Sequence, residues 1–361
     1  MKLRDKIIFI MISIISITLL NIFIFCDKVY YSENEFRYLT KFNNITFDKI
    51  INRKTMNNIE EYLSDHFPLR EEFIKLKNRV ELLVRKTKIN GVYITDKYLI
   101  EEYNGFDKKD LFIKVINEFK NNNKDIDINL MLVPTSISIN GKYLNKYSRT
   151  NKQIEDIEYI YKNSDVNSIN VVNRLKSSKE QVYYYTDHHW TTYGAYLAYK
   201  EFSDNDEDLE LKKVSSDFRG TIYSKVLISN IYDDIYIYEP NYELIVTYDL
   251  GNQKTKKDTL YNMSYLDKKD KYSLFLNNNN PLITIENKEI NNNKNILVIK
   301  DSYANSFIPF LTNDYEYIYV IDPRYYTISI SEYIKNNNVD EVLILYNINT
   351  LNDDTGIYRI K

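Results

Sequence analysis

The sequence predicts an α/β fold with a parallel sheet, located outside the cytoplasm behind one membrane helix. Beyond about residue 108, apolar runs of strand length alternate with amphipathic runs of helical length. Such alternation is typical of parallel strands joined by crossover helices. Near the N-terminus, an apolar run long enough to span a bilayer follows a positively charged start.

The apolar run extends from Ile7 to Phe25 and is interrupted by only a few polar side chains. Lys2, Arg4 and Lys6 precede it, and a positive flank of this kind favours a cytoplasmic N-terminus. Residues after the run would then lie on the far side of the membrane. A cleaved signal peptide is the alternative. Because no small-residue cleavage site follows the run, we expect an uncleaved, single-pass anchor in the cell membrane.

Two helices are predicted between the anchor and the α/β region. Residues 47–63 and 68–86 carry apolar residues at helical spacing, and Asn90-Gly91 is a turn signal. A hairpin or short strand is predicted at 92–100. We therefore divide the chain into a cytoplasmic tip and transmembrane anchor at 1–27, a helical preface at 28–90 and an α/β domain at 91–361.

The elements of the α/β domain are predicted from the period of their apolar residues. The stretch at about 203–288 contains strand-like runs at 235–238 and 243–248 and is interpreted as an antiparallel, β-rich insertion. The other predicted elements are a helix at 108–121, strands at 128–133 and 182–185, a helix at 192–202, a strand at 296–299, a helix at 303–311, a strand at 317–321, a helix at 328–336 and a strand at 341–345.

Charge and cysteine content exclude several classes of protein. The chain has 48 Lys and Arg against 51 Asp and Glu, and this lack of a basic surplus argues against a nucleic-acid partner. It contains none of the glycine-rich loops that bind phosphate, so we expect no nucleotide cofactor. Cys26 is the single cysteine, so no intramolecular disulfide can form and the core must supply the stability.

Polar residues follow the predicted strands at the edge where an open parallel sheet binds its ligand. Ser302 lies directly after one strand and directly before a helix. That position exposes its hydroxyl at a tight turn and leaves backbone N–H groups free to bind a developing oxyanion. A simple helix N-cap is the alternative, and position alone favours it.

The segment Thr186-Asp187-His188-His189-Trp190 changes that balance. A neutral imidazole can take the serine proton when a carboxylate fixes its tautomer. Asp187 and His189, two apart on an extended segment, would point to one side, and His188 to the other side with a structural role. The chain has only three histidines. Finding two of them beside an acid therefore predicts a Ser-His-Asp site that handles acyl esters.

A metal site is the competing interpretation of the same segment. Adjacent His188 and His189 diverge on a strand and would chelate poorly. The third histidine, His66, lies far away in sequence, and no cysteine is available beyond Cys26. Because catalytic zinc usually takes three protein ligands, we expect no metal here.

These motifs resemble the DHHW proteins, which are similar to the alginate O-acetylation proteins of the SGNH hydrolase superfamily. The resemblance covers the anchor, the preface block 61–70, the segment 187–190 and the late block 300–306. It implies a flavodoxin-like, three-layer α/β/α fold that is circularly permuted, with a triad of Ser302, His189 and Asp187. The order of the three residues along the chain reflects that permutation.

Several further residues are candidates for the crevice. Asp301 stands where that superfamily often has a glycine, and no glycine directly follows the late block 300–306. Neither position therefore offers a glycine N–H for the oxyanion hole. The candidate donors are Asn347 and the backbone N–H of Ser302. Arg324 could bind substrate or pair with an acid as scaffold. For Trp190 and Tyr303, stacking on a sugar and packing beside the site are both open.

The resemblance implies an O-acetyltransferase or acetylesterase that acts on a cell-envelope or secreted polysaccharide. It implies no cofactor, and a membrane-bound O-acyltransferase is the partner we expect to supply acetyl groups. The alternative is a catalytically silent polysaccharide-binding or assembly protein that retains the crevice.

Overall fold

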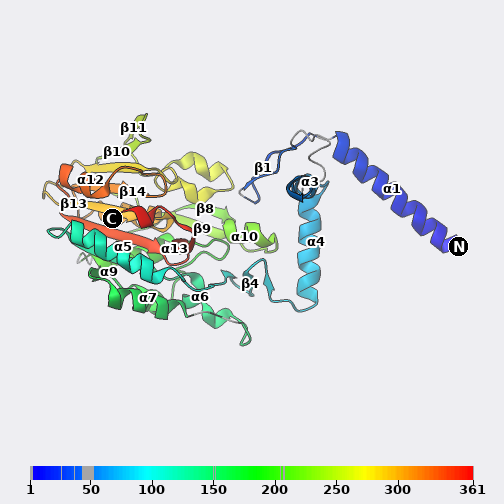
Figure 1. The fold of residues 1–361 in the computed structure, drawn as a ribbon, viewed down its shortest axis with the longest axis horizontal. Helices are drawn as coiled ribbons and strands as arrows, with labels where there is room; N and C mark the ends of the chain where they lie inside the picture. Colours follow the sequence, from blue (N-terminus) through cyan, green and yellow to red (C-terminus); the bar gives the residue numbers. More distant parts are fainter. Residues whose placement is uncertain are drawn as a thin grey trace. The chain divides into compact units, whose positions relative to one another are not determined.

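The computed structural model describes residues 3–25, 27–35, 37–42, 53–148, 150, 152–203, 205 and 208–360. The chain divides into two compact units (Figure 1). The first comprises Met1–Asn90 with Ser224–Ser229, and the second comprises Gly91–Tyr223 with Asn230–Lys361. Residues 47–52 of the first predicted preface helix lie outside the described part.

The first unit begins with α1 (Leu3–Phe25), a helix of 23 residues with a mean hydropathy of 2.8 in its most apolar window. Among the described residues, α1 is the helix long and apolar enough to cross a bilayer. None of its side chains is buried against protein. The predicted apolar N-terminal helix is therefore present, and its orientation in a membrane stays a prediction.

In the rest of the first unit, an aspartate at the end of a helix links two segments of the chain. Its elements are β1 (Tyr31–Ser32), β2 (Arg37–Tyr38), α3 (Arg53–Asp65), α4 (Arg70–Leu83) and β3 (Lys88–Ile89). Asp65 accepts hydrogen bonds from Arg37 at 3.0 Å and from the N–H of Thr40 at 2.8 Å. The guanidinium of Arg37 lowers the pKa of Asp65 to about 2. Asp65 thus ties the end of α3 to the segment after β2.

The second unit is built on an eight-stranded sheet in the order β11-β10-β12-β14-β13-β15-β6-β7 (Figure 1). The neighbours from β14 to β7 pair in parallel. Apart from the exposed edge strand β7, these strands are mostly buried apolar runs, as expected for a sheet covered on both faces. The five parallel strands are β14 (Tyr317–Ile321), β13 (Asn295–Lys300), β15 (Glu341–Asn347), β6 (Asp127–Val133) and β7 (Asn167–Ser168).

The sheet is mixed, which corrects the prediction of a parallel sheet with a separate insertion. Strand β12 (Leu282–Asn287) pairs antiparallel with β14, and β10 (Leu244–Asp249) and β11 (Lys254–Lys257) extend the sheet further. In β10 and β12, buried and partly exposed residues alternate, because each strand packs one face on the core. Within the described part of the stretch at 203–288, β8 (Lys212–Phe218) and β9 (Asp233–Ile237) form an antiparallel pair outside this sheet.

Helices connect and cover these strands, and β4 (Val92–Ile94) with β5 (Leu99–Glu101) forms the predicted hairpin. The α-helices are α5 (Lys109–Asn122), α6 (Ser136–Ile139), α7 (Gln153–Asn163), α8 (Val172–Ser177), α9 (Thr192–Phe202), α10 (Thr221–Val226), α11 (Ile308–Leu311), α12 (Ile330–Asn336) and α13 (Thr350–Asp353). The 3-10 helices are η1 (Gly141–Tyr143), η2 (Met263–Asp267), η3 (Lys271–Leu274), η4 (Ser302–Ser306) and η5 (Ile357–Arg359). The three-layer, circularly permuted form of the fold stays a prediction.

Two predicted elements differ in the structure. The segment 182–185 is not a strand but one side of a bend, in which Tyr183 forms a single bridge with Trp190. The predicted helix at 303–311 is two short pieces, η4 and α11, and Pro309 lies in the first turn of the second. Both differences place backbone turns, rather than regular elements, around Asp187 and Ser302.

Candidate active site

The turn that carries Ser302 is fixed by the residue before it. Asp301 is buried and caps η4, accepting the N–H of Tyr303 at 2.9 Å with one oxygen. Its other oxygen accepts the N–H of Asn347, at the end of neighbouring β15, also at 2.9 Å. A glycine could make neither bond. Asp301 therefore holds the start of η4 to the sheet edge and leaves Ser302 half-buried at the rim.

The structure brings the three predicted residues together. The Nε2 atom of His189 lies 2.8 Å from the Oγ of Ser302, and its Nδ1 lies 2.6 Å from Oδ1 of Asp187. A carboxylate can only accept, so Nδ1 carries the hydrogen and the lone pair of Nε2 faces the serine hydroxyl. This tautomer is the one that can accept the serine proton.

Asp187 is held in place through both of its carboxylate oxygens. Oδ1 also accepts the N–H of His189 at 3.0 Å, and Oδ2 accepts the N–H of Thr221 at 2.7 Å and its hydroxyl at 3.0 Å. Burial acts to raise the pKa of Asp187, but the neighbouring imidazoles and these hydrogen bonds outweigh burial and hold the pKa well below its usual range. The carboxyl is therefore ionised and able to orient His189.

Gly220 makes room for this carboxylate. A Cβ atom at position 220 would lie 2.1 Å from Oδ2 of Asp187, a distance that no side chain can keep. The chain has only 7 glycines. A glycine directly before Thr221 was therefore the one local signal for this contact.

His188 lies differently from the prediction. The segment bends instead of extending, and the rings of His188 and His189 lie side by side with centroids 3.8 Å apart. The Nδ1 atom of His188 lies 2.6 Å from the hydroxyl oxygen of Thr221. The expected divergence of the two imidazoles is therefore wrong.

The bend itself is fixed by Asp233 at the start of β9. Its carboxylate accepts the N–H groups of Tyr185 at 2.7 Å and Thr186 at 2.9 Å, as well as the Thr186 hydroxyl at 2.6 Å. Burial raises the pKa of Asp233 to about 6, so it is ionised at neutral pH. Because these N–H groups bond to a side chain, segment 182–185 cannot continue as a strand.

Tyr272 of η3 packs on the imidazole. Its ring stacks on His189 with centroids 3.7 Å apart and an angle of 9° between planes. Its hydroxyl donates to the carbonyl of Ser302 at 3.1 Å. Burial, followed by the charge of neighbouring His188, lowers the pKa of His189 to about 4 despite the opposing effect of Asp187. His189 is therefore a neutral base at neutral pH.

Three residues that contact the triad or its supporting bend were missed by the sequence analysis. Thr221, Asp233 and Tyr272 all come from the stretch at 203–288, which was interpreted as an insertion of unknown role. Only Gly220 gave a local signal for any of them. The stretch therefore completes the surroundings of Asp187, His189 and Ser302.

The two aromatic candidates differ in what they touch. Trp190 is 0% exposed, and its indole N–H donates to the carbonyl of Tyr303 at 2.9 Å, so packing describes it and a stacking contact with a sugar does not. Tyr303 is also almost fully buried, but one side of it lines a cavity, and its hydroxyl donates to the carbonyl of His188.

Asn347 and Arg324 are largely committed to the scaffold. The Asn347 side chain donates to the carbonyl of Val133 at 3.2 Å, which disfavours it as an oxyanion donor. The Nε of Arg324 donates to Asp322 at 2.8 Å, and its Nη2 donates to the other oxygen of the same carboxylate. Arg324 thus pairs with the acid, although its side chain also lines the cavity.

The cluster of Asp187, His188 and His189 could hold a metal by distance, since one ligand atom of each lies within 4.8 Å of the others. The hydrogen bonds of the cluster fit proton transfer better. Both nitrogens of His189 and both oxygens of Asp187 already have partners at hydrogen-bond distance. An ion would have to displace several of these bonds.

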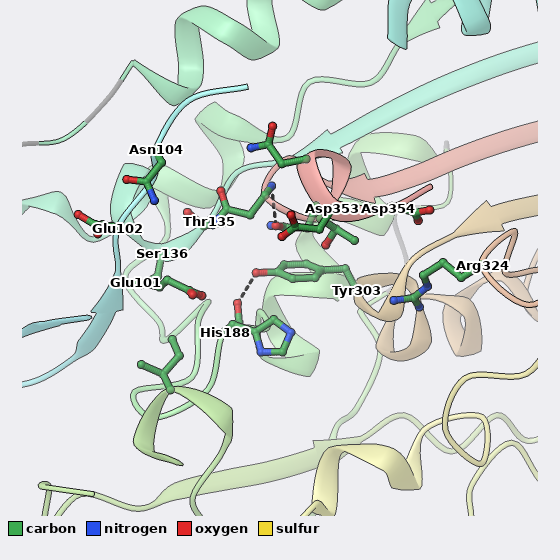
Figure 2. A pocket seen from close by; sticks show the side chains of 15 residues that line it. Glu101, Glu102, Asn104, Thr135, Ser136, His188, Tyr303, Arg324, Asp353 and Asp354 are labelled. Atoms are coloured by element: carbon green, nitrogen blue, oxygen red, sulfur yellow. Dashed lines mark hydrogen bonds between the residues drawn. The ribbon is translucent and has the colours of Figure 1, made fainter. Parts of the chain in front are cut away.

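A cavity of about 450 Å³ opens beside His188 and Tyr303, which are the sequence neighbours of His189 and Ser302. Figure 2 shows Tyr303 in the middle of its lining, with the hydroxyl joined to the backbone of His188. The lining is polar and rich in carboxylates and amides. It comprises Glu101, Glu102, Asn104, Thr135, Ser136, His188, Ile222, Tyr303, Arg324, Asn347, Asn349, Thr350, Asn352, Asp353 and Asp354.

Comparison with solved structures shows the same fold. A DHHW family protein from Eubacterium siraeum is 24% identical, with a TM-score of 0.66 over 75% of this chain and 95% of that chain. Bacillus cereus PatB1 with a sulfonyl adduct is 22% identical, with a TM-score of 0.64 over 75% of this chain and 98% of that chain. No curated protein matches the chain.

The family comparison covers the region that contains Asp187, His189 and Ser302. The family model described as DHHW protein matches residues 89–321, more than half of the chain. The predicted resemblance is thereby confirmed, and the chain belongs to the DHHW protein family.

Proposed function

We propose that this chain is a serine-dependent O-acetyltransferase or acetylesterase that acts on a polysaccharide outside the cytoplasm. The observation that carries the proposal is the continuous hydrogen-bonded series from Asp187 through His189 to Ser302, with distances of 2.6 and 2.8 Å. A neutral imidazole between a carboxylate and a hydroxyl is the arrangement that activates serine as a nucleophile.

In the first step, the Oγ of Ser302 attacks the acyl carbonyl carbon while its proton passes to Nε2 of His189. The new Oγ–C bond forms a tetrahedral oxyanion. As this intermediate collapses, the bond to the alcohol breaks and His189 returns the proton to the leaving oxygen. A sugar hydroxyl or water then repeats the sequence on the acyl-serine, with His189 again accepting and returning the proton.

The backbone N–H of Ser302 is the donor proposed for the oxyanion. It is the first N–H of η4, and a first helical N–H has no acceptor within its own helix. Two of the bonds made by Asp301 hold this turn to the sheet edge. The donor is thus preorganised before substrate arrives.

The family supports the acyl chemistry, and α1 supports the location. PatB1, which shares the fold, was solved with a sulfonyl adduct, and sulfonyl reagents bond to nucleophilic side chains. An apolar helix behind three basic residues favours a catalytic region outside the cytoplasm. Acetyl groups would then have to cross the membrane, so a membrane-bound O-acyltransferase is the proposed supplier.

The decisive experiment traps the acyl-enzyme. Full-length protein in detergent is mixed with p-nitrophenyl acetate, quenched in acid, digested and analysed by mass spectrometry. We expect one acetyl group on the peptide that contains Ser302, located to that residue by fragmentation. Acetylation confined to lysine or tyrosine side chains, or equal acetylation of heat-denatured protein, would contradict the proposed enzymatic activity. A catalytically silent polysaccharide-binding protein would then be the remaining alternative.

The pH dependence provides a second test. We expect the ester hydrolysis rate to stay level from neutral pH down to about pH 5 and to be halved near pH 4. The reason is that burial lowers the pKa of His189 to about 4, and only the unprotonated base can accept the serine proton. Initial rates in a buffer series measure this profile. A midpoint near about 6.5, the ordinary value for histidine, would contradict it.

A further inference from the structure

The cavity beside His188 and Tyr303 is lined by groups that accept hydrogen bonds. Four carboxylates, four amide side chains and four hydroxyl side chains line it. Arg324 is the one lysine or arginine among the described lining residues (Figure 2). Its guanidinium already donates to both oxygens of buried Asp322. The lining therefore offers acceptors in excess and no lysine or arginine that lacks an acid partner.

Asp354 is the most informative member of this lining. Asp354 is only 4% exposed. Its Oδ1 accepts hydrogen bonds from the N–H groups of Gly356 and Ile357, the latter at 3.2 Å. Oδ2 is buried and has no hydrogen-bond partner among the described residues. Less than 1 Å² of this oxygen is accessible, so a ligand hydroxyl can reach it only when the neighbouring groups move. Because a buried acceptor without a donor is costly, such a bond would then stabilise the complex.

An anionic ligand would meet the opposite situation. To bind Arg324 it would have to compete with Asp322, whose Oδ2 also lies 3.7 Å from the buried ammonium of Lys300. At the same time it would approach the carboxylates of Asp353 and Asp354 in the same cavity. Like charges this close oppose binding, most strongly at low salt.

The cavity also lies beside the sequence neighbours of Ser302 and His189. Tyr303, the residue after Ser302, lines it, as does His188, whose ring lies 3.8 Å from that of His189. A sugar chain bound in the cavity would have to extend past these two residues to reach the hydroxyl of Ser302. Its volume of about 450 Å³ falls within the range of small-ligand sites.

We infer that this cavity is the acceptor subsite for an uncharged, hydroxyl-rich glycan, that Asp354 accepts a sugar hydroxyl there, and that the carboxylates exclude polyanionic glycans. This inference rests on the proposed function for the identity of the acceptor. It adds the charge class of the substrate and a residue that selects it.

The test measures binding without chemistry. Full-length Ser302→Ala protein in detergent is titrated by calorimetry with a neutral hexasaccharide of β-linked glucose and with a hexasaccharide of galacturonic acid. We expect the anionic sugar to bind at least about tenfold more weakly at low ionic strength, with the difference shrinking as salt is added. Equal binding of the two, tighter binding of the anionic sugar, or no binding of either overturns the inference.

Two substitutions test the residues. Asp354→Asn keeps one oxygen for Gly356 and Ile357 but places an amide where Oδ2 accepted, so we expect about tenfold weaker binding of the neutral sugar. Asp353→Asn changes an exposed side chain and should instead narrow the gap between the two sugars. Glu158→Gln, an exposed acid on α7 outside the lining, is the matched control.

The outcomes separate this inference from the proposed function. Melting curves first establish that the Asp353→Asn and Asp354→Asn proteins are folded. If they then bind both sugars as the Glu158→Gln control does, the proposed subsite is contradicted, even where an acyl-enzyme forms at Ser302. If the protein prefers the neutral sugar but the wild type forms no acyl-enzyme, the proposed enzymatic activity is contradicted and the proposed glycan-binding site is supported.

Discussion

Replacing Ser302 by alanine is expected to lower acetyl-ester hydrolysis by about 10,000-fold or more, because the proposed nucleophile is removed. Stability should change little. The turn is held by Asp301, and the substitution removes only the hydrogen bond between Oγ and His189. Initial rates with p-nitrophenyl acetate, together with a melting curve, measure both effects.

The double variant provides the internal control. Groups that act as one unit lose their effect together, so His189→Ala in the Ser302→Ala background should lower the rate no further. Ser302→Ala protein that hydrolyses the ester at the wild-type rate would exclude Ser302 as the nucleophile. Multiplicative losses in the double variant would show that the two residues act separately.

Asp187→Asn is expected to lower the rate by about 10,000-fold while leaving the shape of the site intact. The amide can donate to Nδ1 of His189, which would move the imidazole hydrogen to Nε2, where it faces Ser302 and blocks proton acceptance. The N–H and hydroxyl of Thr221 would also compete for the one remaining oxygen. The melting temperature of the variant should therefore fall modestly as well.

The tautomer can be observed directly because the chain contains only three histidines. Nitrogen NMR of histidine-labelled protein should show the hydrogen of His189 on Nδ1 in the wild type and on Nε2 in Asp187→Asn. Glu158→Gln should change neither the spectrum nor the rate. A wild-type tautomer retained in Asp187→Asn, or a rate within tenfold of wild type, would contradict this role of the carboxylate.

Local pattern was sufficient for much of the fold. Helix α9 and strand β14 have the bounds predicted from the period of their apolar residues. The predicted bounds of β6, β9, β10, β13 and β15 differ by one or two residues at their ends, whereas no bounds were predicted for β8, β11 and β12. The three residues of the proposed triad were found in the same way, since a serine after a strand and an acid beside a histidine are local features. The structure then brings them within hydrogen-bond distance.

Contacts distant in sequence could not be predicted. The bend at residues 182–189 depends on the carboxylate of Asp233, more than forty positions away in the chain. Without that contact, alternating side chains predict an extended segment, and His188 was placed on the wrong side. Tyr272 likewise reaches His189 from η3, and nothing in its neighbouring residues indicates that contact.

The role of the stretch at 203–288 was missed for a related reason. Alternation of buried and exposed residues in β12 shows that one face is covered, but it does not reveal which strand is the neighbour. That neighbour is β14, which β13 flanks on the other side. An antiparallel strand therefore adds to the parallel sheet where the sequence indicated a β-rich insertion in the domain.

The antiparallel strands at this side of the sheet also protect it from aggregation. Without β12, the apolar strand β14 would present a row of unpaired N–H and C=O groups, and such a border recruits strands from other molecules. The outermost strand is instead β11, in which three of four residues are lysines and all four are exposed. Repulsion between these ammonium groups keeps one copy of the protein from adding to the sheet of another.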